Sequence, residues 1–414
     1  MTYTLYRVLM WLLVPWALLR LVIRARRQRA YLFNIPERFG FYSQKPHRPV
    51  IWIHAVSVGE TRAAEPLIHA LAKRHPDKQI LITNMTPTGR ETSVALFGDD
   101  VLRCYLPYDL APAVNHFLGH FSPVSAIVME TELWPTLVAR CDRRGIAVQL
   151  VNARLSDRSA KRYARFPALS SRMLSELKLI CAQTERDAQR FRHLGAPRVE
   201  VTGNLKFDRA APEEQLIAGK ALRQLFGEER QIFLAASTRD GEETLVLDAI
   251  SKIAEPALLT VIVPRHPQRF DAVADLLRRG GLNFQRRSED RPIEATTRVV
   301  LGDSMGEMFA YYAACDIAFV GGSLLPLGGQ NLLEACAVGK PVVVGPHTFN
   351  FEEATEQAIE AGAATRVDNA DMLATTVATL LANPAQAKSI GEAGERFMEM
   401  HRGATRRTLA AIGL

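Results

Sequence analysis

Short apolar segments alternate with helical segments along most of this chain, and this alternation constrains the fold more than any other feature. Several intervening segments, among them 61–73, 88–97 and 133–144, have the periodicity of helices. Strands that are apolar on both faces, with helices between them, are typical of a parallel, doubly wound α/β sheet. The predicted strands of the first series are Val50–Ala55, Gln79–Asn84, Val101–Leu106, Ser125–Met129, Ala147–Asn152, Lys178–Gln183 and Val199–Thr202.

A second series of the same kind follows a join at Lys206–Glu214 that is rich in Pro and charged residues. A length of 414 residues fits two domains and a short appendage. We therefore expect an appendage at 1–30, one Rossmann-like domain at 31–207 and a second at 208–414, whose last helix is free to pack back on the first domain. The strands predicted for the second series are Gln231–Ala236, Leu258–Pro264, Arg298–Leu301, Ile317–Val320 and Pro341–Gly345.

The positive charge of the chain is concentrated at its N-terminus. The net charge is +7, and the first 50 residues carry nine Lys or Arg against the single acid Glu37. The remaining chain is nearly neutral, whereas a nucleic-acid-binding protein is expected to carry its basic residues on the folded domain. Basic residues beside an apolar segment instead favour contact with anionic lipids of an inner leaflet, and nucleic acid is not an expected partner.

The apolar segment Leu5–Ile23 is followed by the basic block Arg24–Arg29. We expect it to form a single membrane-anchoring helix that holds the body of the protein at the cytoplasmic face of the cell inner membrane. A helix that lies flat in the membrane interface is the alternative, since only Val8–Leu19 is free of charge. A cleaved signal peptide is disfavoured, because the basic block follows the apolar run.

Acidic residues follow two strands of the first series, and ligands of such sheets bind beyond the carboxyl ends of the strands. The small-residue turn Ser57–Gly59 is followed by Glu60, which lies where a helix start would otherwise bind an anion. Capping of that helix by Glu60 or Thr61 is the simpler interpretation. After the fourth strand come Glu130 and Glu132, of which Glu130 is the preferred functional acid because it leaves the strand first.

A basic cluster follows the fifth strand, with Tyr163 and Phe166 interleaved. It is either a solvated helix face or the mouth of a site for a phosphorylated, membrane-embedded substrate, which Lys and Arg would bind through charge-assisted hydrogen bonds. The candidate acceptor-binding residues of the first domain are Ser57, Gly59, Arg154, Arg158, Lys161 and Arg162.

The strand ends of the second domain carry a different set of groups. A glycine-rich stretch lets backbone approach a ligand, and we expect Gln330–Leu333 to begin a helix whose N–H groups face a phosphate. Glu334 is placed to accept two ribose hydroxyls. The candidate donor-binding residues are Ser237, Thr238, Arg265, His266, Met305, Gly306, Glu307, Gln330, Asn331, Leu332, Leu333 and Glu334.

These two domains together predict a nucleotide-sugar transferase with two facing Rossmann-like domains. No GxGxxG opens the first strand–helix unit and no GxxxxGK[ST] occurs, which sets aside dinucleotide oxidoreductases and P-loop NTPases. Five scattered cysteines without a CxxC pair predict buried thiols rather than disulfides or a metal site.

Nine short motifs, in order, resemble the 3-deoxy-D-manno-octulosonic acid (Kdo) transferases of lipid A assembly. They are HAVSVGET at His54–Thr61, METELWP at Met129–Pro135, VNARLS at Val151–Ser156, TGNLKFD at Thr202–Asp208, ASTRDGEE at Ala236–Glu243, VPRHPQRF at Val263–Phe270, DSMGEM at Asp303–Met308 and GGSLLPLGGQNLLEA at Gly321–Ala335, with the N-terminal apolar segment as the ninth. The resemblance implies a GT-B glycosyltransferase that moves Kdo from CMP-Kdo to the distal glucosamine 6′-hydroxyl of lipid IVA, with inversion.

The resemblance also implies roles for individual residues. Glu60 is the expected general base, and Glu130 and Lys206 are expected to shape the reaction zone. Arg265, the backbone of Gly306 and the helix start at Asn331 are candidates for binding the leaving phosphate. No DxD motif is present, so neither a metal ion nor another cofactor is expected. The motifs do not distinguish the addition of one Kdo from the addition of two.

Two other functions are compatible with parts of the pattern. One is a two-domain transferase that uses a UDP-sugar and a different lipid-linked acceptor, which competition by CMP and UDP would distinguish. The other is a membrane-tethered nucleotide-sugar-binding protein without catalytic activity. The concentration of acids and bases at the strand ends argues against the second function.

Overall fold

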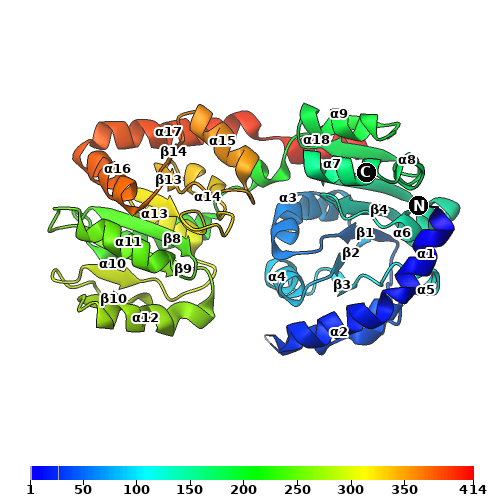
Figure 1. Cartoon of the computed structure of the whole chain (residues 1–414), viewed down its shortest axis with the longest axis horizontal. Coiled ribbons are helices and arrows are strands. Elements are labelled where there is room, and N and C mark those ends of the chain that lie inside the picture. Colours follow the sequence, from blue (N-terminus) through cyan, green and yellow to red (C-terminus); the bar gives the residue numbers. More distant parts are fainter. Residues whose placement is uncertain (1, 27) are drawn as a thin grey trace. The chain divides into compact units, whose positions relative to one another are not determined.

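The computed structural model describes residues 2–26 and 28–414, and the chain divides into two compact units (Figure 1). Unit 1 comprises the residues up to Arg209 together with His401–Leu414, and unit 2 comprises Ala210–Met400. Each unit contains one seven-stranded sheet in which every pair of neighbouring strands is parallel. The predicted class of two parallel α/β units is therefore confirmed. All five cysteines are buried and free, as predicted.

The sheet of unit 1 has the strand order β3-β2-β1-β4-β5-β6-β7, and all seven predicted strands form. The strands are β1 (Val50–His54), β2 (Gln79–Asn84), β3 (Leu102–Tyr105), β4 (Pro123–Met129), β5 (Ala147–Ala153), β6 (Leu179–Ala182) and β7 (Val199–Val201). The helices of this unit after its N-terminal segment are α3 (Val58–Arg74), α4 (Pro87–Phe97), α5 (Ala111–Phe121), α6 (Pro135–Arg143), α7 (Asp157–Ala164), α8 (Pro167–Ser175), α9 (Glu185–His193), η3 (Leu205–Asp208) and α18 (Ala404–Ile412).

Strand β1 shows why this sheet is covered on both sides. Its residues are all completely buried. Successive side chains of a strand point to opposite faces, so Val50 and Trp52 pack in one cluster with α5, α6, α8 and α9. Ile51 and Ile53 pack in the other cluster with α3, α4 and α18. A continuous apolar run is the sequence pattern that this double burial requires.

The sheet of unit 2 has the order β10-β11-β9-β8-β12-β13-β14. Its strands are β8 (Ile232–Thr238), β9 (Leu259–Pro264), β10 (Phe284–Arg286), β11 (Val299–Leu301), β12 (Ile317–Val320), β13 (Val342–Val344) and β14 (Ala364–Arg366). The two outermost strands, β10 and β14, were not predicted, because their sequences, FQR and ATR, lack the continuous apolar run of the inner strands. The helices are α10 (Glu213–Phe226), α11 (Glu242–Ser251), η4 (Pro267–Arg269), α12 (Phe270–Arg279), η5 (Arg287–Glu289), α13 (Met308–Ala314), α14 (Leu333–Cys336), α15 (Glu352–Glu360), α16 (Ala370–Ala382) and α17 (Pro384–His401).

The N-terminal apolar segment forms two helices, α1 (Tyr3–Leu12) and α2 (Val14–Ala25), followed by η1 (Arg29–Leu32) and η2 (Ile35–Phe39). The expectation of one continuous helix is wrong, because Pro15 in the first turn of α2 lacks the N–H that would continue α1.

Within residues 2–26 and 28–414 no single helix is long and apolar enough to cross a membrane. Helices α1 and α2 meet that test of length and composition only as a pair, which is bent by 45°. Arg27 of the basic block lies outside the described residues. The membrane anchor stays a prediction.

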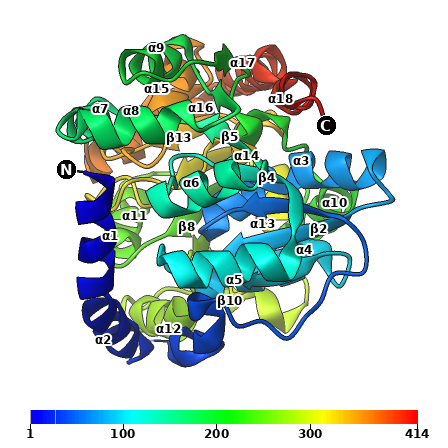
Figure 2. The ribbon, with the colours of Figure 1, turned by 90° about the vertical axis from the view of Figure 1, so that its right-hand side faces the viewer.

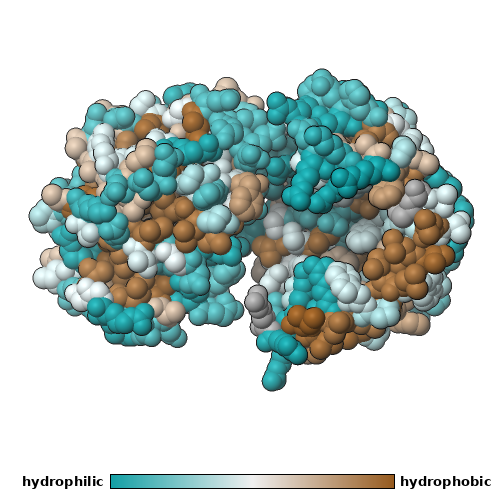
Figure 3. Space-filling view, in the orientation of Figure 1, coloured by the Kyte–Doolittle hydropathy of each residue, from teal (hydrophilic) through white to brown (hydrophobic). Residues whose placement is uncertain are grey.

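Helix α1 is attached to the body of unit 1. It begins beside α6 and α8 and runs towards α2, as two views at right angles show (Figures 1 and 2). The Tyr6 hydroxyl donates to Asp109 Oδ2 at 2.8 Å, and the same carboxylate accepts the backbone N–H groups of Thr136 and Leu137 at 2.8 Å each. The buried Asp109 thus joins α1 to the first turn of α6. Figure 3 shows hydrophobic residues, in brown, along the outer side of α1 and α2.

The C-terminal segment completes unit 1. Asp208, at the end of η3, accepts hydrogen bonds from the backbone N–H groups of Gly403, at 2.6 Å, and Thr405. The Gln149 side chain of β5 donates to the carbonyl of Ile412 at 3.3 Å. Ile412 itself is buried in the cluster that covers the α3 face of the sheet. The last residues of the chain therefore belong to the core of the first unit.

Replacing Ile412 by Ala should lower the free energy of unfolding of unit 1 by about 2–5 kcal/mol, because it leaves a cavity between α18 and the sheet. Denaturant unfolding followed by circular dichroism measures this loss. Arg406→Ala is the matched control on the same helix, since Arg406 is exposed and its loss should change stability by less than about 0.5 kcal/mol. Equal stability of the two variants would contradict the role of α18.

Candidate active site

Both sheets reverse their strand order at one point, and several of the predicted functional residues of each unit follow the two strands that flank it. In unit 1 the reversal lies between β1 and β4, which are followed by Glu60 and Glu130. In unit 2 it lies between β8, which ends at Thr238, and β12, which is followed by Gly321. Open parallel sheets bind their ligands at such switch points, because the helices that leave the two neighbouring strands diverge to opposite faces.

Glu60 lies in the first turn of α3 and folds back onto the turn that precedes the helix. Its Oε2 accepts a hydrogen bond from the backbone N–H of Val56, and the backbone N–H of Ser57 also bonds to the carboxylate. Ser57 is the N-terminal cap residue, but its side chain makes no capping bond. The Thr61 hydroxyl donates to the Ser57 carbonyl at 2.8 Å. The expectation that Thr61 caps the helix is therefore wrong, whereas Glu60 does satisfy N–H groups at its start.

The environment of Glu60 raises its pKa to about 8. Burial is the largest cause, since only 9% of the residue is exposed. The neighbouring carboxylate of Glu130 is the next cause and Glu132 adds to it, while the N–H groups of Val56 and Ser57 act in the opposite direction. A carboxylate with a pKa near neutrality is a suitable general base, because it accepts a proton more strongly than an ordinary Glu.

Glu130 follows β4 with its backbone in the left-handed region, at φ 57°. Such a conformation costs a non-glycine residue on the order of 1–3 kcal/mol and is concentrated at functional sites. Its Oε1 lies 3.1 Å from Lys206 Nζ. The structure therefore brings together all three residues predicted to be catalytic, since the Glu130 that pairs with Lys206 also raises the pKa of Glu60.

Two asparagines position the segment that carries Lys206. Asn204 Oδ1 accepts the backbone N–H of Lys206 at 3.0 Å, and Asn152 Oδ1 accepts that of Leu205, also at 3.0 Å. Asn152 is itself left-handed, at φ 55°, where the ladder between β5 and β6 changes register. Asn152 was not among the predicted site residues. The signal was an Asn at a strand end, since Asn tolerates this conformation better than most residues.

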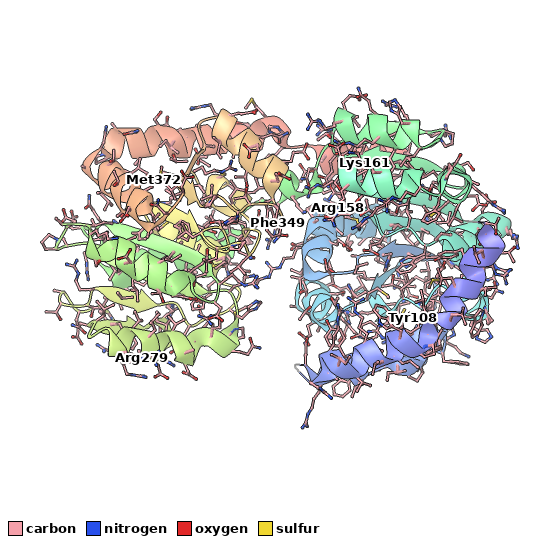
Figure 4. All side chains as sticks on the ribbon, in the orientation of Figure 1. Tyr108, Arg158, Lys161, Arg279, Phe349 and Met372 are labelled. Atoms are coloured by element: carbon pink, nitrogen blue, oxygen red, sulfur yellow. The ribbon has the colours of Figure 1, made fainter. Side chains whose placement is uncertain are left out.

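The basic residues predicted to bind the acceptor lie on or just before α7. Arg158 and Lys161 both project from this helix (Figure 4) and, like Arg162, they are exposed, while Arg154 is partly buried. Asp157, the one acid of the helix, is paired with Arg190 at 2.7 Å. The helix thus presents a basic surface after β5, on the same unit as the acid cluster. Gly59, which was also predicted to bind the acceptor, lies in the first turn of α3 and is exposed.

At the switch point of unit 2, three predicted donor-binding residues contact one another. The backbone N–H of Arg265 donates to the Thr238 carbonyl at 2.9 Å, and its Nε donates to Gln330 Oε1 at 3.2 Å. Ser237 is left-handed, at φ 55°, and β8 changes register against β9 at this residue. The Thr238 hydroxyl donates to Glu243 Oε1 at 3.0 Å. The switch point is therefore a connected polar surface.

His266 lies in a positive field. Burial lowers its pKa most, and the guanidinium groups of Arg265, Arg239 and Arg269 lower it further. The imidazole is therefore neutral at pH 7, and the positive charge of this surface comes from the arginines. Several arginines near a strand end attract an anionic ligand to that position.

The glycine-rich stretch is held by a buried carboxylate that was not among the predicted site residues. Glu242 is completely buried, and it accepts the backbone N–H groups of Gly322, Ser323 and Leu324 at 2.5, 2.9 and 3.0 Å. These N–H groups are therefore already occupied by a protein anion. Gly321 must be glycine, because a Cβ there would lie 2.8 Å from the Thr238 Cα.

The helix after the glycine-rich stretch begins at the end of the predicted start, Gln330–Leu333. It begins at Leu333 and ends at Cys336, so Gln330 and Asn331 precede it. The side chain of Asn331 accepts the backbone N–H of Leu333 at 3.2 Å. Leu332 and Leu333 are buried, which leaves only their backbone for a ligand. Glu334 lies in the first turn of this helix, as predicted.

The turn after β11 carries Met305, Gly306 and Glu307. Met305 is 54% exposed, and Gly306 is left-handed with open space where a Cβ would stand. Glu307 is held by the protein, because it accepts the Ser304 hydroxyl at 2.5 Å and lies 3.5 Å from Arg287 Nη2. This turn therefore offers an exposed apolar side chain and free space beside a glycine.

The described residues, 2–26 and 28–414, contain no group of three His, Cys, Asp or Glu side chains arranged to hold a metal ion. Glu60 and Glu132 are both affected by the charge of Glu130, but the three acids do not converge in such a group. The nearby Glu130 and Glu132 therefore raise the pKa of Glu60 rather than forming a set of metal ligands with it.

Comparison with known families divides the chain in the same way as the sheets. Residues 34–209 match the family model of the 3-deoxy-D-manno-octulosonic-acid transferases (kdotransferases). Residues 244–397 match the model of the glycosyl transferases group 1. The solved structure of UDP-GlcNAc 2-epimerase from Neisseria meningitidis aligns with 88% of this chain and 99% of its own, at 18% identity and a TM-score of 0.60, which is a likeness of fold alone.

Curated relatives match nearly the whole chain. The 3-deoxy-D-manno-octulosonic acid transferase of Bordetella pertussis is 43% identical over 391 residues, which cover 91% of this chain and 90% of the relative. The enzyme of the same name from Haemophilus influenzae is 42% identical and covers 92% of this chain and 90% of its own. Identity of this extent, together with the acid cluster at the switch point, shows that the chain belongs to the 3-deoxy-D-manno-octulosonic acid transferase family of glycosyltransferases.

Proposed function

We propose that this Kdo transferase of lipopolysaccharide biosynthesis moves Kdo from CMP-Kdo to the 6′-hydroxyl of the distal glucosamine of lipid IVA, with inversion at the anomeric carbon. The observation that carries the proposal is the buried carboxyl group of Glu60, whose pKa is raised to about 8 at the switch point of unit 1. The family membership supports Kdo as the transferred sugar.

Inversion requires a single displacement. The acceptor hydroxyl attacks the anomeric carbon while the bond to the CMP phosphate breaks, and the electron pair of that bond leaves with CMP. Glu60 accepts the hydroxyl proton. Lys206, held 3.1 Å from Glu130, supplies positive charge to the Kdo carboxylate or to the phosphate as negative charge develops on it. No covalent intermediate on the protein is needed.

The donor is assigned to unit 2. Arg265 and the backbone near Gly306 and Asn331 would bind the phosphate, with His266 beside them. Glu334 would accept the two ribose hydroxyls. The remaining predicted donor contacts are Ser237, Thr238, Met305, Glu307, Gln330, Leu332 and Leu333, of which the two leucines would act through their backbone because their side chains are buried.

The acceptor is assigned to unit 1, where Ser57, Gly59 and Arg154 lie near the strand ends and the basic side chains of α7 would meet its phosphates. A second Kdo would be added by the same groups if the product re-enters as acceptor. We further propose that α1 and α2 hold the enzyme at the cytoplasmic face of the inner membrane. Their exposed apolar side chains, Leu5, Val8, Leu9, Leu12, Leu19, Val22 and Ile23, support this placement.

Replacing Glu60 by Gln should lower kcat by about 10²–10⁴ while the affinity for CMP stays unchanged, because Gln keeps the shape but cannot accept the proton. Transfer from CMP-Kdo to lipid IVA and calorimetric titration with CMP measure the two effects. Glu65→Gln, one helical turn and a half further along α3, is the matched control and should retain activity. Turnover like that of the unmodified enzyme in the Glu60 variant would exclude the base.

The pH dependence should follow the same group. Because the ionised form of Glu60 is the active one and its pKa is about 8, kcat/KM should rise between pH 6 and 9, and at pH 6 it should be about a hundredfold below its plateau.

The stability of the folded protein should change in the direction opposite to activity, and decrease as the pH rises. The folded pKa exceeds that of an unfolded Glu, so the stabilisation present below the unfolded pKa is lost as the pH rises through 8. The thermal unfolding temperature of the Glu60→Gln variant should not show this loss as the pH rises. An equal pH dependence of the unfolding temperature in the variant and the unmodified enzyme would contradict the raised pKa of Glu60.

The transfer should not require a divalent cation, because arginine and lysine side chains are proposed to balance the charge of the leaving phosphate. Activity should therefore stay within twofold after extensive treatment with EDTA. A control with EDTA and excess Mg²⁺ separates chelation from other effects of the reagent. Loss of activity that Mg²⁺ restores would contradict the proposal.

A further inference from the structure

Unit 1 contains a cavity that the assigned catalytic and donor sites do not use. Its volume is about 430 Å³, which is within the range of small-molecule sites. It lies between α1, the connection from β4 to α6, α7 and α8, and we call it the α1–α8 cavity. Carbon atoms form most of its wall, chiefly from Leu133, Trp134, Tyr163, Phe166, Leu169 and Met173.

The α1–α8 cavity adjoins the acid cluster through one short segment. Thr131, Leu133, Trp134 and Pro135 line the cavity, and they directly follow Glu130. Glu132, within this segment, is close enough to raise the pKa of Glu60 and also that of Tyr163 in the cavity wall. One face of the segment therefore serves the reaction centre while the other forms an apolar wall.

Helix α1 closes the cavity on another side and is fixed there. Tyr6 contributes to the wall while its hydroxyl is bonded to Asp109. The Tyr3 hydroxyl donates to the Pro135 carbonyl at 3.2 Å, and the Arg172 guanidinium lies over the Tyr3 ring at 4.9 Å. The same helix exposes Leu5 and Leu9 on its outer side. An apolar cavity wall and an apolar outer surface thus belong to one helix.

The rim of the cavity combines apolar and basic groups. Phe166 is 42% exposed. The exposed Arg162 lines the cavity as well, and Arg158 and Lys161 lie on the same helix. A molecule that suits this rim has a hydrocarbon chain for the cavity and anionic groups for α7. An acylated sugar phosphate has both parts, and its sugar would then lie towards the acid cluster.

We propose that the α1–α8 cavity binds one acyl chain of the lipid acceptor and thereby places the sugar hydroxyl at Glu60. The proposal rests on the assignment of a phosphorylated, acylated acceptor in the proposed function, and it adds where and how that acceptor is recognised. The enzyme then recognises a hydrocarbon chain of the acceptor as well as its phosphates. Removal of acyl chains therefore weakens binding of the acceptor even when the reacting sugar is intact.

The first experiment fills the cavity. Ser159→Phe places a ring in it from α7, since Ser159 lines the cavity and is only partly buried. With full-length enzyme in detergent micelles, we expect the KM for lipid IVA to rise at least about tenfold. The kcat/KM for the O-deacylated form of the same disaccharide bisphosphate should stay within twofold. Ala164→Phe, exposed on the same helix and outside the cavity lining, should change neither value.

An equal change of both acceptors in Ser159→Phe would indicate a general structural effect and would overturn the proposal, as would the absence of any change. Phe166→Ala provides a second variant that opens the rim instead of filling the cavity. It should also raise the KM for lipid IVA and leave the O-deacylated acceptor unaffected. Equal thermal unfolding temperatures of the variants and the unmodified enzyme exclude loss of folding.

The second experiment detects the chain without relying on transfer. Trp134 lines the cavity, whereas Trp52 is buried in the core and Trp11 and Trp16 are exposed on α1 and α2. In a Trp11→Phe/Trp16→Phe background, lipid IVA with brominated acyl chains should quench Trp134 fluorescence, and Ser159→Phe should abolish the quenching. Transfer without quenching would refute the cavity alone. Quenching without any transfer would refute the proposed function alone.

Discussion

The reversal of strand order between β1 and β4 is the constraint on which unit 1 depends. A parallel sheet must bury both faces, so helices leave its strands towards opposite sides. Where the order reverses, the helices that follow the two neighbouring strands leave towards opposite faces of the sheet. The ends of β1 and β4 are therefore left without a covering helix. Glu60 and Glu130 follow those two strands. The acid pair is therefore a product of topology, because the residues are separated by 70 positions in the sequence.

That topology also explains how a carboxyl group acquires an unusual pKa without an elaborate site. Glu60 is buried because it folds back onto the turn before α3, and Glu130 is aimed at the same space by a left-handed backbone. Burial and a neighbouring negative charge both oppose ionisation. Lys206 pairs with Glu130 and so offsets the negative charge of that carboxylate. The site therefore contains the positive charge of Lys206, while the proposed base, Glu60, can still bind a proton.

Much of this fold could be predicted from the sequence, since buried parallel strands are apolar throughout and their ends are polar. The seven strands of unit 1 follow from that rule, and so does the selection of Thr238, Arg265 and Gln330, of which Arg265 contacts the other two. The sequence could not show that Asn152 positions η3 or that Glu242 occupies the glycine-rich stretch, because both depend on backbone N–H groups far along the chain. It also could not show the break between α1 and α2 or the cavity beside them, since a cavity is a property of packing.

Unit 1 is interrupted in the sequence by unit 2, and this gives it an unusual order of assembly. Unit 2 is a continuous segment, whereas unit 1 needs α18, which is synthesised after all of unit 2. Domains generally fold as units during synthesis, starting from the N-terminus, but here unit 1 begins first and receives α18 only after unit 2 has been synthesised. The bonds from Gly403 and Thr405 to Asp208 form on the segment that carries Lys206. A nascent chain without α18 therefore lacks these two bonds, and the segment that carries Lys206 is fully joined to unit 1 only after unit 2 has been synthesised.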